Sequence, residues 1–245
     1  MSEDVFWKGP REFGVTRWSL VARARGAPSA EQDRALNQLC EAYWYPLYAF
    51  IRRKGHDAES AKDLVQDFLS RWLQGPALQR ADAAQGKFRT FLLAALSDFL
   101  VDQHRRDHAQ KRGGDVSHVA LDGLELEQRY KLEPLSSDSP ESLYDKHWAE
   151  ALLEQAKARL REEGETSGRP EFFAALEPYV LSDMGDGDAE RLGERFGMMR
   201  GAVSAALFRL RKKLRKRVEQ EVLETLNDES ELPGEMEHLF AALLT

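Results

Sequence analysis

Eight lysines and arginines stand between positions 200 and 217, in a stretch that contains no aspartate or glutamate. They are Arg200, Arg209, Arg211, Lys212, Lys213, Arg215, Lys216 and Arg217. A cluster of cations can bind nucleic-acid phosphates, or it can pair with carboxylates of the same protein. The formal net charge of −7 argues against a protein that coats DNA indiscriminately. A local basic patch can still bind DNA, because salt screens surface charges beyond about 10 Å.

Residues that could catalyse a reaction or hold a metal are scarce. His104 and His108 lie one helical turn apart in HRRDH, but Arg105 stands where a zinc-protease motif needs glutamate, so a solvated helix face is favoured. No glycine-rich phosphate loop and no nucleophile–base pair is visible. The sequence therefore predicts no enzymatic activity, no cofactor and no metal.

The composition points to a cytoplasmic protein. The single cysteine, Cys40, excludes an internal disulfide and fits a reducing compartment. No signal peptide is recognisable, and no apolar run approaches the roughly 20 residues of a membrane span.

The segment DAERLGERFGMMRGAVSAALFRLR fits a helix-turn-helix, with Gly193 small enough for close helix approach and Gly197 able to take the positive φ of the turn. Contact between the two helices is expected from Leu192, Phe196, Met198, Val203 and Leu207. The alternative is a helical hairpin with a solvated basic end. In a helix-turn-helix, the first turns of the second helix face the bases. We therefore expect major-groove contacts from Met199, Arg200, Gly201, Ser204 and Ala205, and phosphate or acidic-surface contacts from the cluster Arg209–Arg217, which includes Arg211 and Lys212.

Helical periodicity dominates the chain, and the predicted fold class is all-α: two helical domains joined by a long linker. The predicted helices cover residues 16–24, 31–54, 58–74, 88–110, 141–163, 170–182, 187–196, 200–227 and 235–244. The predicted parts are an N-terminal extension (1–30), a first domain (31–112), a linker (113–140), a second domain (141–227) and a C-terminal extension (228–245). VALDGLELEQRY, within the linker, has enough apolar residues to dock elsewhere.

The first domain carries two features of interest. The helix 58–74 has a polar stripe opposite its apolar face, formed by Asp63, Gln66, Asp67 and Ser70. The segment 86–112, which contains the predicted helix 88–110, combines rings and cations, a mixture that suits unstacked bases: Phe88, Phe91, Phe99, Arg89, Arg105, Arg106, Lys111 and Arg112. Considered alone, an ordinary core face is the stronger interpretation of that helix.

Together these segments resemble a bacterial RNA polymerase sigma factor of the sigma-70 superfamily, extracytoplasmic-function (ECF) type, with N- and C-terminal extensions. ALNQLCEAYWYPLYAFIRRKGHDAESAKDLVQDFLSRWL and FRTFLLAALSDFLVDQHRR resemble its first domain, and DAERLGERFGMMRGAVSAALFRLRKKLRKRV its second. The resemblance implies a transcription initiation factor that binds core RNA polymerase through the β′ clamp helices and the β flap, and that binds promoter DNA.

The resemblance also implies roles for individual residues. The stripe Asp63, Gln66, Asp67 and Ser70 would contact the clamp helices. The −10 element would be melted and captured by Phe88, Arg89, Asp98, Asp102, Arg105 and Arg106. The −35 element would be read by Met199, Arg200, Gly201, Ser204, Ala205, Arg209, Arg211 and Lys212.

Three departures from the family pattern bear on these roles. Ser60-Ala61-Lys62-Asp63 replaces an Asp-Ala-Glu-Asp run, and phosphorylation of Ser60 would restore lost negative charge. Asp98 replaces a base-reading asparagine, and it can still accept from cytosine or adenine amino groups. Ser204, Ala205 and Ala206 replace polar and basic residues of the recognition helix, which leaves Arg200 as the best reader.

Two rival functions and two regulatory partners remain open. The first rival is a helix-turn-helix regulator whose N-terminal domain binds a ligand or protein rather than polymerase. The second is an adaptor whose basic helix pairs with an acidic partner. An anti-sigma factor or a protein kinase would be a further partner of a sigma factor, and the terminal extensions are candidate regulatory surfaces.

Overall fold

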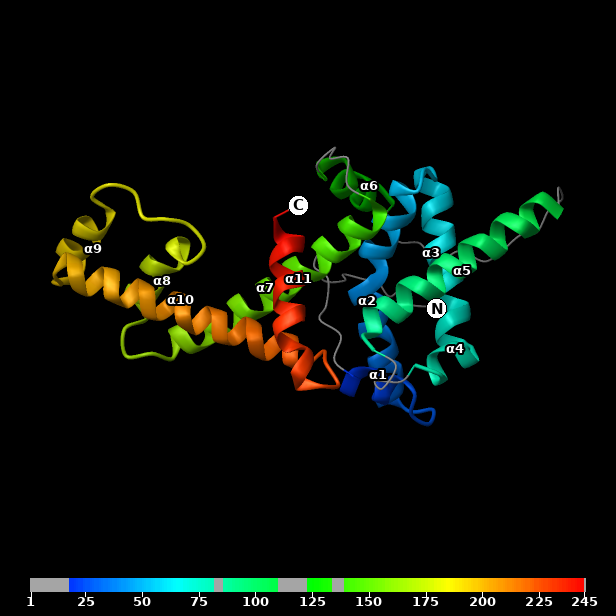
Figure 1. Cartoon of the computed structure of the whole chain (residues 1–245), viewed down its shortest axis with the longest axis horizontal. Coiled ribbons are helices and arrows are strands. Elements are labelled where there is room, and N and C mark those ends of the chain that lie inside the picture. Colours follow the sequence, from blue (N-terminus) through cyan, green and yellow to red (C-terminus); the bar gives the residue numbers. More distant parts are fainter. Residues whose placement is uncertain (1–17, 82–85, 110–122, 134–138, 245) are drawn as a thin grey trace, which may run out of the picture. The chain divides into compact units, whose positions relative to one another are not determined.

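The protein is helical throughout the residues that the computed structural model describes, which are 18–81, 86–109, 123–133 and 139–244 (Figure 1). No strand occurs in these ranges, so the all-helical prediction is confirmed. The α-helices are α1 (Trp18–Ala24), α2 (Ala30–Arg53), α3 (Ala58–Gln74), α4 (Pro76–Gln79), α5 (Phe88–Ala109), α6 (Gly123–Leu132), α7 (Pro140–Glu165), α8 (Pro170–Leu176), α9 (Asp188–Phe196), α10 (Arg200–Leu223) and α11 (Leu232–Leu243). Two 3₁₀ turns, η2 (Glu177–Tyr179) and η3 (Glu229–Glu231), precede α9 and α11.

The described helices form two compact units. The first takes its residues from 1–151 and 224–245, and the second from 152–223. The chain therefore passes between the units twice, once within α7 and once after α10. The domain boundaries expected from the sequence, 31–112 and 141–227, stay a prediction, since the compact units divide the chain at other positions.

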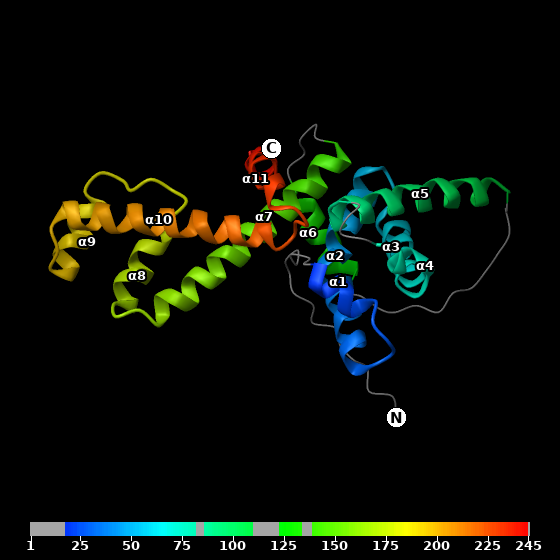
Figure 2. The same ribbon diagram turned by 60° about the horizontal axis from the view of Figure 1, so that its bottom comes forward.

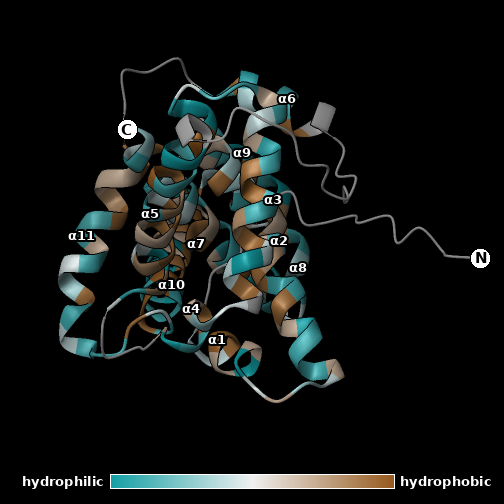
Figure 3. Cartoon of the chain, turned by 90° about the vertical axis from the view of Figure 1, so that its right-hand side faces the viewer, coloured by the Kyte–Doolittle hydropathy of each residue, from teal (hydrophilic) through white to brown (hydrophobic). Residues whose placement is uncertain are grey.

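The first unit has a core rich in aromatic side chains. Phe88, at the start of α5, packs with ring-centroid distances of 5.8 Å to Trp18, 5.6 Å to Tyr43 and 5.6 Å to Trp72. These rings come from α1, α2 and α3, so a single side chain joins four helices. Figure 3 shows hydrophobic residues on α2 and α5 and hydrophilic ones along much of the surface.

Helix α3 begins and ends where its sequence requires. Asp57 is its N-cap and accepts a hydrogen bond from the backbone N–H of Ser60 at 2.9 Å. Gly75 follows its last residue, and Pro76 then starts α4, a short helix that the sequence did not predict. Ala61, Val65, Phe68, Leu69 and Trp72 of α3 are buried, which leaves its polar stripe on the opposite face.

The segment predicted to be a linker contains a docked helix, α6. Its Glu127 accepts hydrogen bonds from Arg52 Nε at 3.0 Å and from the Tyr48 hydroxyl at 2.8 Å, both on α2. Arg129 stacks 3.6 Å above the ring of Tyr45. Residues 123–132 are therefore part of the first unit, whereas the rest of 113–138 lies largely outside the described residues.

The C-terminal extension also forms a docked helix. Helix α11 starts at Leu232, earlier than predicted. Pro233 is tolerated in its first turn because proline lacks a backbone N–H, and the N–H groups of a first turn have no partner within the helix. Its Met236, Leu239 and Ala242 are buried in the first unit. In Figure 3, hydrophobic and hydrophilic bands alternate along α11.

In the second unit, α9 crosses the N-terminal end of α10, as Figures 1 and 2 both show. Gly197 ends α9 with φ +64, which confirms the predicted positive φ of the turn. A Cβ atom on Gly193 would lie 2.5 Å from the backbone oxygen of Met198, so the turn that leads into α10 passes too close to α9 for a side chain at this position. Val203 and Leu207 are buried below α9. The pair is a helix-turn-helix in its local geometry.

Candidate functional site

The polar stripe of α3 lies on the face opposite its buried residues. Asp63 and Ser70 are exposed, and Gln66 and Asp67 are partly exposed. Asp67 is engaged within the helix, because Arg71 Nε donates to Asp67 Oδ1 at 2.8 Å. Such an exposed pair contributes little stability, so Asp67 can exchange Arg71 for another cation at small cost. The stripe is thus an accessible acidic surface.

Ser60 lies at the start of α3, one turn before Asp63. Its hydroxyl donates to Asp57 Oδ2 at 2.8 Å, and its backbone N–H donates to Asp57 Oδ1. These hydrogen bonds lower the pKa of Asp57 below its ordinary range. A modifying group on Ser60 would therefore break one hydrogen bond and would sit beside an ionised carboxylate.

An open groove of about 1000 Å³ runs between α3, α4 and α5. Phe68 and Trp72 of α3 and Phe91 and Phe99 of α5 line it, with Phe68 and Phe99 5.6 Å apart. Its charged lining residues are Arg25, Arg71, Arg80, Asp98 and Asp102. Rings, cations and hydrogen-bond acceptors thus meet in one concave surface, and rings beside cations are the combination that binds unstacked bases.

The structure places two predicted −10 residues in the interior. Phe88 is 3% exposed and Arg89 is 6% exposed, so neither side chain is presented to solvent. Phe88 is held by its three ring neighbours, and Arg89 by ion pairs with Glu235 and Asp145. A direct DNA contact by either residue does not follow from this arrangement, because long-range contacts that the sequence does not reveal have buried them.

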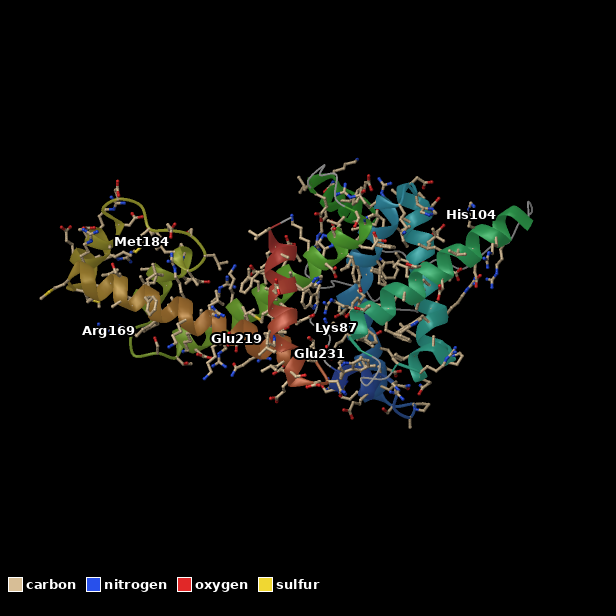
Figure 4. The ribbon with its side chains drawn as sticks, viewed as in Figure 1. Lys87, His104, Arg169, Met184, Glu219 and Glu231 are labelled. Atoms are coloured by element: carbon tan, nitrogen blue, oxygen red, sulfur yellow. The ribbon has the colours of Figure 1, made fainter. Side chains whose placement is uncertain are left out.

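The C-terminal half of α5 extends beyond α3, as Figures 1 and 2 show, and most of its side chains between residues 98 and 106 are exposed. Asp98, Asp102, Arg105 and Arg106 all lie on this accessible part, and Asp102 is 3.7 Å from Arg105. His104 projects from the same segment (Figure 4). Within the described residues, no group of three or more histidine, cysteine, aspartate or glutamate side chains could hold a metal ion.

The N-terminal turns of α10 are accessible. Met199 is 84% exposed, and Gly201, Ser204 and Ala205 are also exposed. Arg200 pairs with Glu190 of α9 at 2.9 Å, and the side chain of Arg200 is exposed while that of Glu190 is partly exposed. A surface pair of this kind is weak, so Arg200 can leave Glu190 for a base or a phosphate.

The basic cluster of α10 divides into two groups. Arg211 donates to the backbone oxygens of Tyr179 at 3.1 Å and Ser182 at 2.6 Å, and Lys213 and Arg217 pair with Glu163 of α7. Arg211 thus holds the loop before α9, and its predicted DNA contact stays a prediction. Arg209, Lys212 and Lys216 are exposed on the outward face of α10. The helix thus neutralises internal charge and also presents cations to solvent.

Sequence reasoning missed several residues of these surfaces. Phe208 is 69% exposed and lies one turn before Lys212, on the same outward face of α10 as Ala205. Helical periodicity could have identified it, because Phe208 lies opposite the buried residues Val203, Leu207 and Leu210. Arg25 and Arg80, which line the groove, carried no such signal, because the chain must fold before they meet α5.

A family model described as "ECF sigma factor" matches residues 31–176, which run from α2 through α8. The match ends before α9, so the helix-turn-helix rests on its own geometry. No curated protein and no solved structure matches the chain. In the described part of the chain, no helix is long and apolar enough to cross a membrane. Because the matched region covers more than half of the sequence, the chain belongs to the ECF sigma factor family, whose members direct RNA polymerase to promoters and are not enzymes.

Proposed function

We propose that α3 carries the surface that docks on the β′ clamp helices of core RNA polymerase. The observation that supports this role is the accessible acidic stripe of Asp63 and Asp67, with Gln66 and Ser70 beside them. Carboxylates on one face of a helix complement a basic coiled coil and guide its approach. The second unit, with α8 to α10, would contact the β flap. The protein would act in the cytoplasm, where polymerase and promoter DNA meet.

The groove between α3, α4 and α5 would capture an unstacked base from the non-template strand of the −10 element. Phe91 and Phe99 offer ring faces, Arg25, Arg71 and Arg80 offer cations for the backbone, and Asp98 offers an acceptor at the rim. Each stacked base contributes about 1–3 kcal/mol. That gain offsets the few kcal/mol lost when a base leaves the duplex, so binding alone would separate the strands.

Asp98 should select bases that carry an amino group. A carboxylate accepts a hydrogen bond from cytosine or adenine but repels the O4 atom of thymine. We expect Asp98→Asn to reduce the preference for oligocytidylate over oligothymidylate by about 1 kcal/mol, or about fivefold in affinity. Fluorescence anisotropy of the full-length protein with labelled single strands measures this preference.

Asp102→Asn is the matched control for Asp98→Asn, because it removes the same charge one helical turn further along α5 and lines the same groove. We expect it to raise the affinity for all strands alike, through weaker repulsion of phosphate. If both variants changed the preference equally, Asp98 would act through its charge alone and would read no base.

Helix α10 would read the −35 element with its exposed N-terminal turns. Arg200 is the residue able to contact a base edge in bidentate fashion, and Phe208 offers an apolar surface for a thymine methyl group. Arg209 and Lys212 would bind phosphates next to these contacts. The small residues Gly201, Ser204 and Ala205 would let the backbone of α10 lie close to the base edges in the major groove of the DNA.

A protein kinase acting on Ser60 would strengthen the docking surface. Phosphate on Ser60 would add about −1.5 to −2 charge near Asp63 and extend the stripe by one turn. We expect Ser60→Asp to bind core polymerase more tightly than Ser60→Ala, by about threefold. Surface plasmon resonance with immobilised core enzyme gives both affinities, and equal values would remove Ser60 as a switch. An anti-sigma factor would compete for the same stripe.

A further inference from the structure

A buried ionic cluster joins the start of α5 to the C-terminal helix. Glu235 of α11 is 1% exposed, and its carboxylate pairs with both Lys87 and Arg89. Figure 4 shows Lys87 at the beginning of α5, and its side chain is 29% exposed. Burial opposes the negative charge of Glu235, but Arg89 and Lys87 outweigh burial, and the pKa of this carboxyl lies below its ordinary range. Glu235 is therefore ionised at neutral pH.

The two cations share their site with an aromatic ring. Arg89 lies 3.6 Å above the ring of Trp148 on α7, and Arg89 Nε is 3.7 Å from Asp145 Oδ1. We call Lys87, Arg89 and Trp148 the α5 cation site. An arginine held flat against an indole, with a lysine next to it, presents two charge-assisted donors to one anion. Such a site can bind a phosphate group.

Glu235 is a buried charged residue on the inner face of α11, where an apolar residue would be expected. The rest of its inner face is apolar, with Met236, Leu239 and Ala242 buried. A buried ion pair contributes no more stability than a well-packed hydrophobic group of the same size, because the charges lose their hydration. Glu235 therefore adds little that an apolar residue could not supply. What it does add is charge complementarity to the α5 cation site.

The docking of α11 is also of a kind that can be reversed. The helix has 12 residues, and a helix of that length is only marginally stable in water without tertiary contacts. A further polar contact of α11, between His238 and Asp145 at 3.2 Å, is partly exposed. Release of α11 would expose Lys87 and Arg89 on the helix that leads into the groove.

We propose that α11 is an internal competitor for nucleic-acid phosphate: Glu235 occupies the α5 cation site until a backbone phosphate of single-stranded promoter DNA takes its place. The proposal rests on the proposed role of α5 in binding the −10 strand. It accounts for the burial of Arg89, because this residue is held by a group that a phosphate can replace. The C-terminal extension then sets how readily the first unit binds an open strand.

The first test compares two full-length variants, Glu235→Gln and Glu237→Gln. Both remove one carboxylate from α11, but Glu237 is exposed and faces away from the cluster. The probe is a fluorescein-labelled oligothymidylate of about 12 nucleotides. Glu235→Gln should bind it more tightly than Glu237→Gln. One additional phosphate contact steepens the salt dependence, so this advantage should shrink about 2.6-fold between about 50 and 200 mM salt. Equal affinities and equal salt dependence would overturn the proposal.

The second test uses the unmodified protein and does not depend on how well a variant folds. If α11 and a phosphate compete for one site, binding of either must weaken binding of the other. Saturating oligothymidylate should therefore speed amide hydrogen exchange in residues 232–243 at least about threefold. Unchanged or slower exchange in α11 would overturn the proposal. Neither test needs polymerase, so a failure of the protein to bind core enzyme would count against the proposed function alone.

Discussion

Replacement of Gly193 by alanine is expected to destabilise the second unit by about 2 kcal/mol and to abolish initiation that depends on a −35 element. The added methyl group would lie 2.5 Å from the backbone oxygen of Met198, and a backbone atom cannot move aside as a side chain can. The turn at Met198 must then shift relative to α9, and Arg200, which follows this turn directly, shifts with it. Thermal unfolding and run-off transcription on sheared genomic DNA, with sequencing of the transcripts, measure both effects.

Gly201→Ala is the matched control for Gly193→Ala in the unfolding experiment. Gly201 lies in the first turn of α10, and a Cβ atom there would meet no atom within 4 Å. Alanine is the better helix former, so this variant should gain about 0.5 kcal/mol. Equal changes in melting temperature for the two variants would show that the backbone of Met198 does not lie close to Gly193.

Reversal of charge in the α3 stripe is expected to weaken the binding of core polymerase strongly. Asp63→Lys would place a cation against the basic clamp helices, at a cost of about 2 kcal/mol, which is about a 30-fold loss of affinity for core polymerase. Adding Asp67→Lys should weaken binding further. Both positions are on the outward face of α3, so the helix itself should remain folded. Competition with an unmodified, labelled protein for core enzyme gives the affinities.

Glu150→Lys supplies the control for the charge reversals. Glu150 is an exposed carboxylate of α7 in the same compact unit, and the substitution changes the net charge by the same amount. It should leave the affinity for core polymerase within about twofold of the unmodified protein, because long-range effects of one exposed charge are screened. A loss as large as that of Asp63→Lys would mean that net charge, and not the stripe, governs docking.

The sequence predicted the long helices well because their signals are local. The span of α3 agrees with the prediction because Asp57 caps it and Gly75-Pro76 ends it. The same kind of signal identified the turn at Gly197. Helix α6 was missed because its stability comes from contacts of Glu127 with Arg52 and Tyr48, more than 70 positions away in the chain. Propensity alone did not set that segment apart from a linker.

The candidate surfaces could be predicted only where they lie on one helix. The α3 stripe and the exposed turns of α10 follow from periodicity, and the structure keeps both accessible. Arg89 and Arg211 have the right type and position for DNA, but Glu235 and the carbonyls of Tyr179 and Ser182 engage them. These partners come from other segments, so no pattern within α5 or α10 could reveal them. For the same reason, the groove became visible only in the folded chain.

Core-enzyme binding and transcription by the purified full-length protein show whether it directs RNA polymerase to promoters. The protein is mixed with core RNA polymerase and passed through a size-exclusion column, and the recovered complex is then assayed by run-off transcription on sheared genomic DNA. We predict that the protein elutes with core enzyme and that the complex starts transcripts at defined positions preceded by common −35 and −10 elements. Elution apart from core enzyme, or transcripts no different from those of core enzyme alone, would contradict the account.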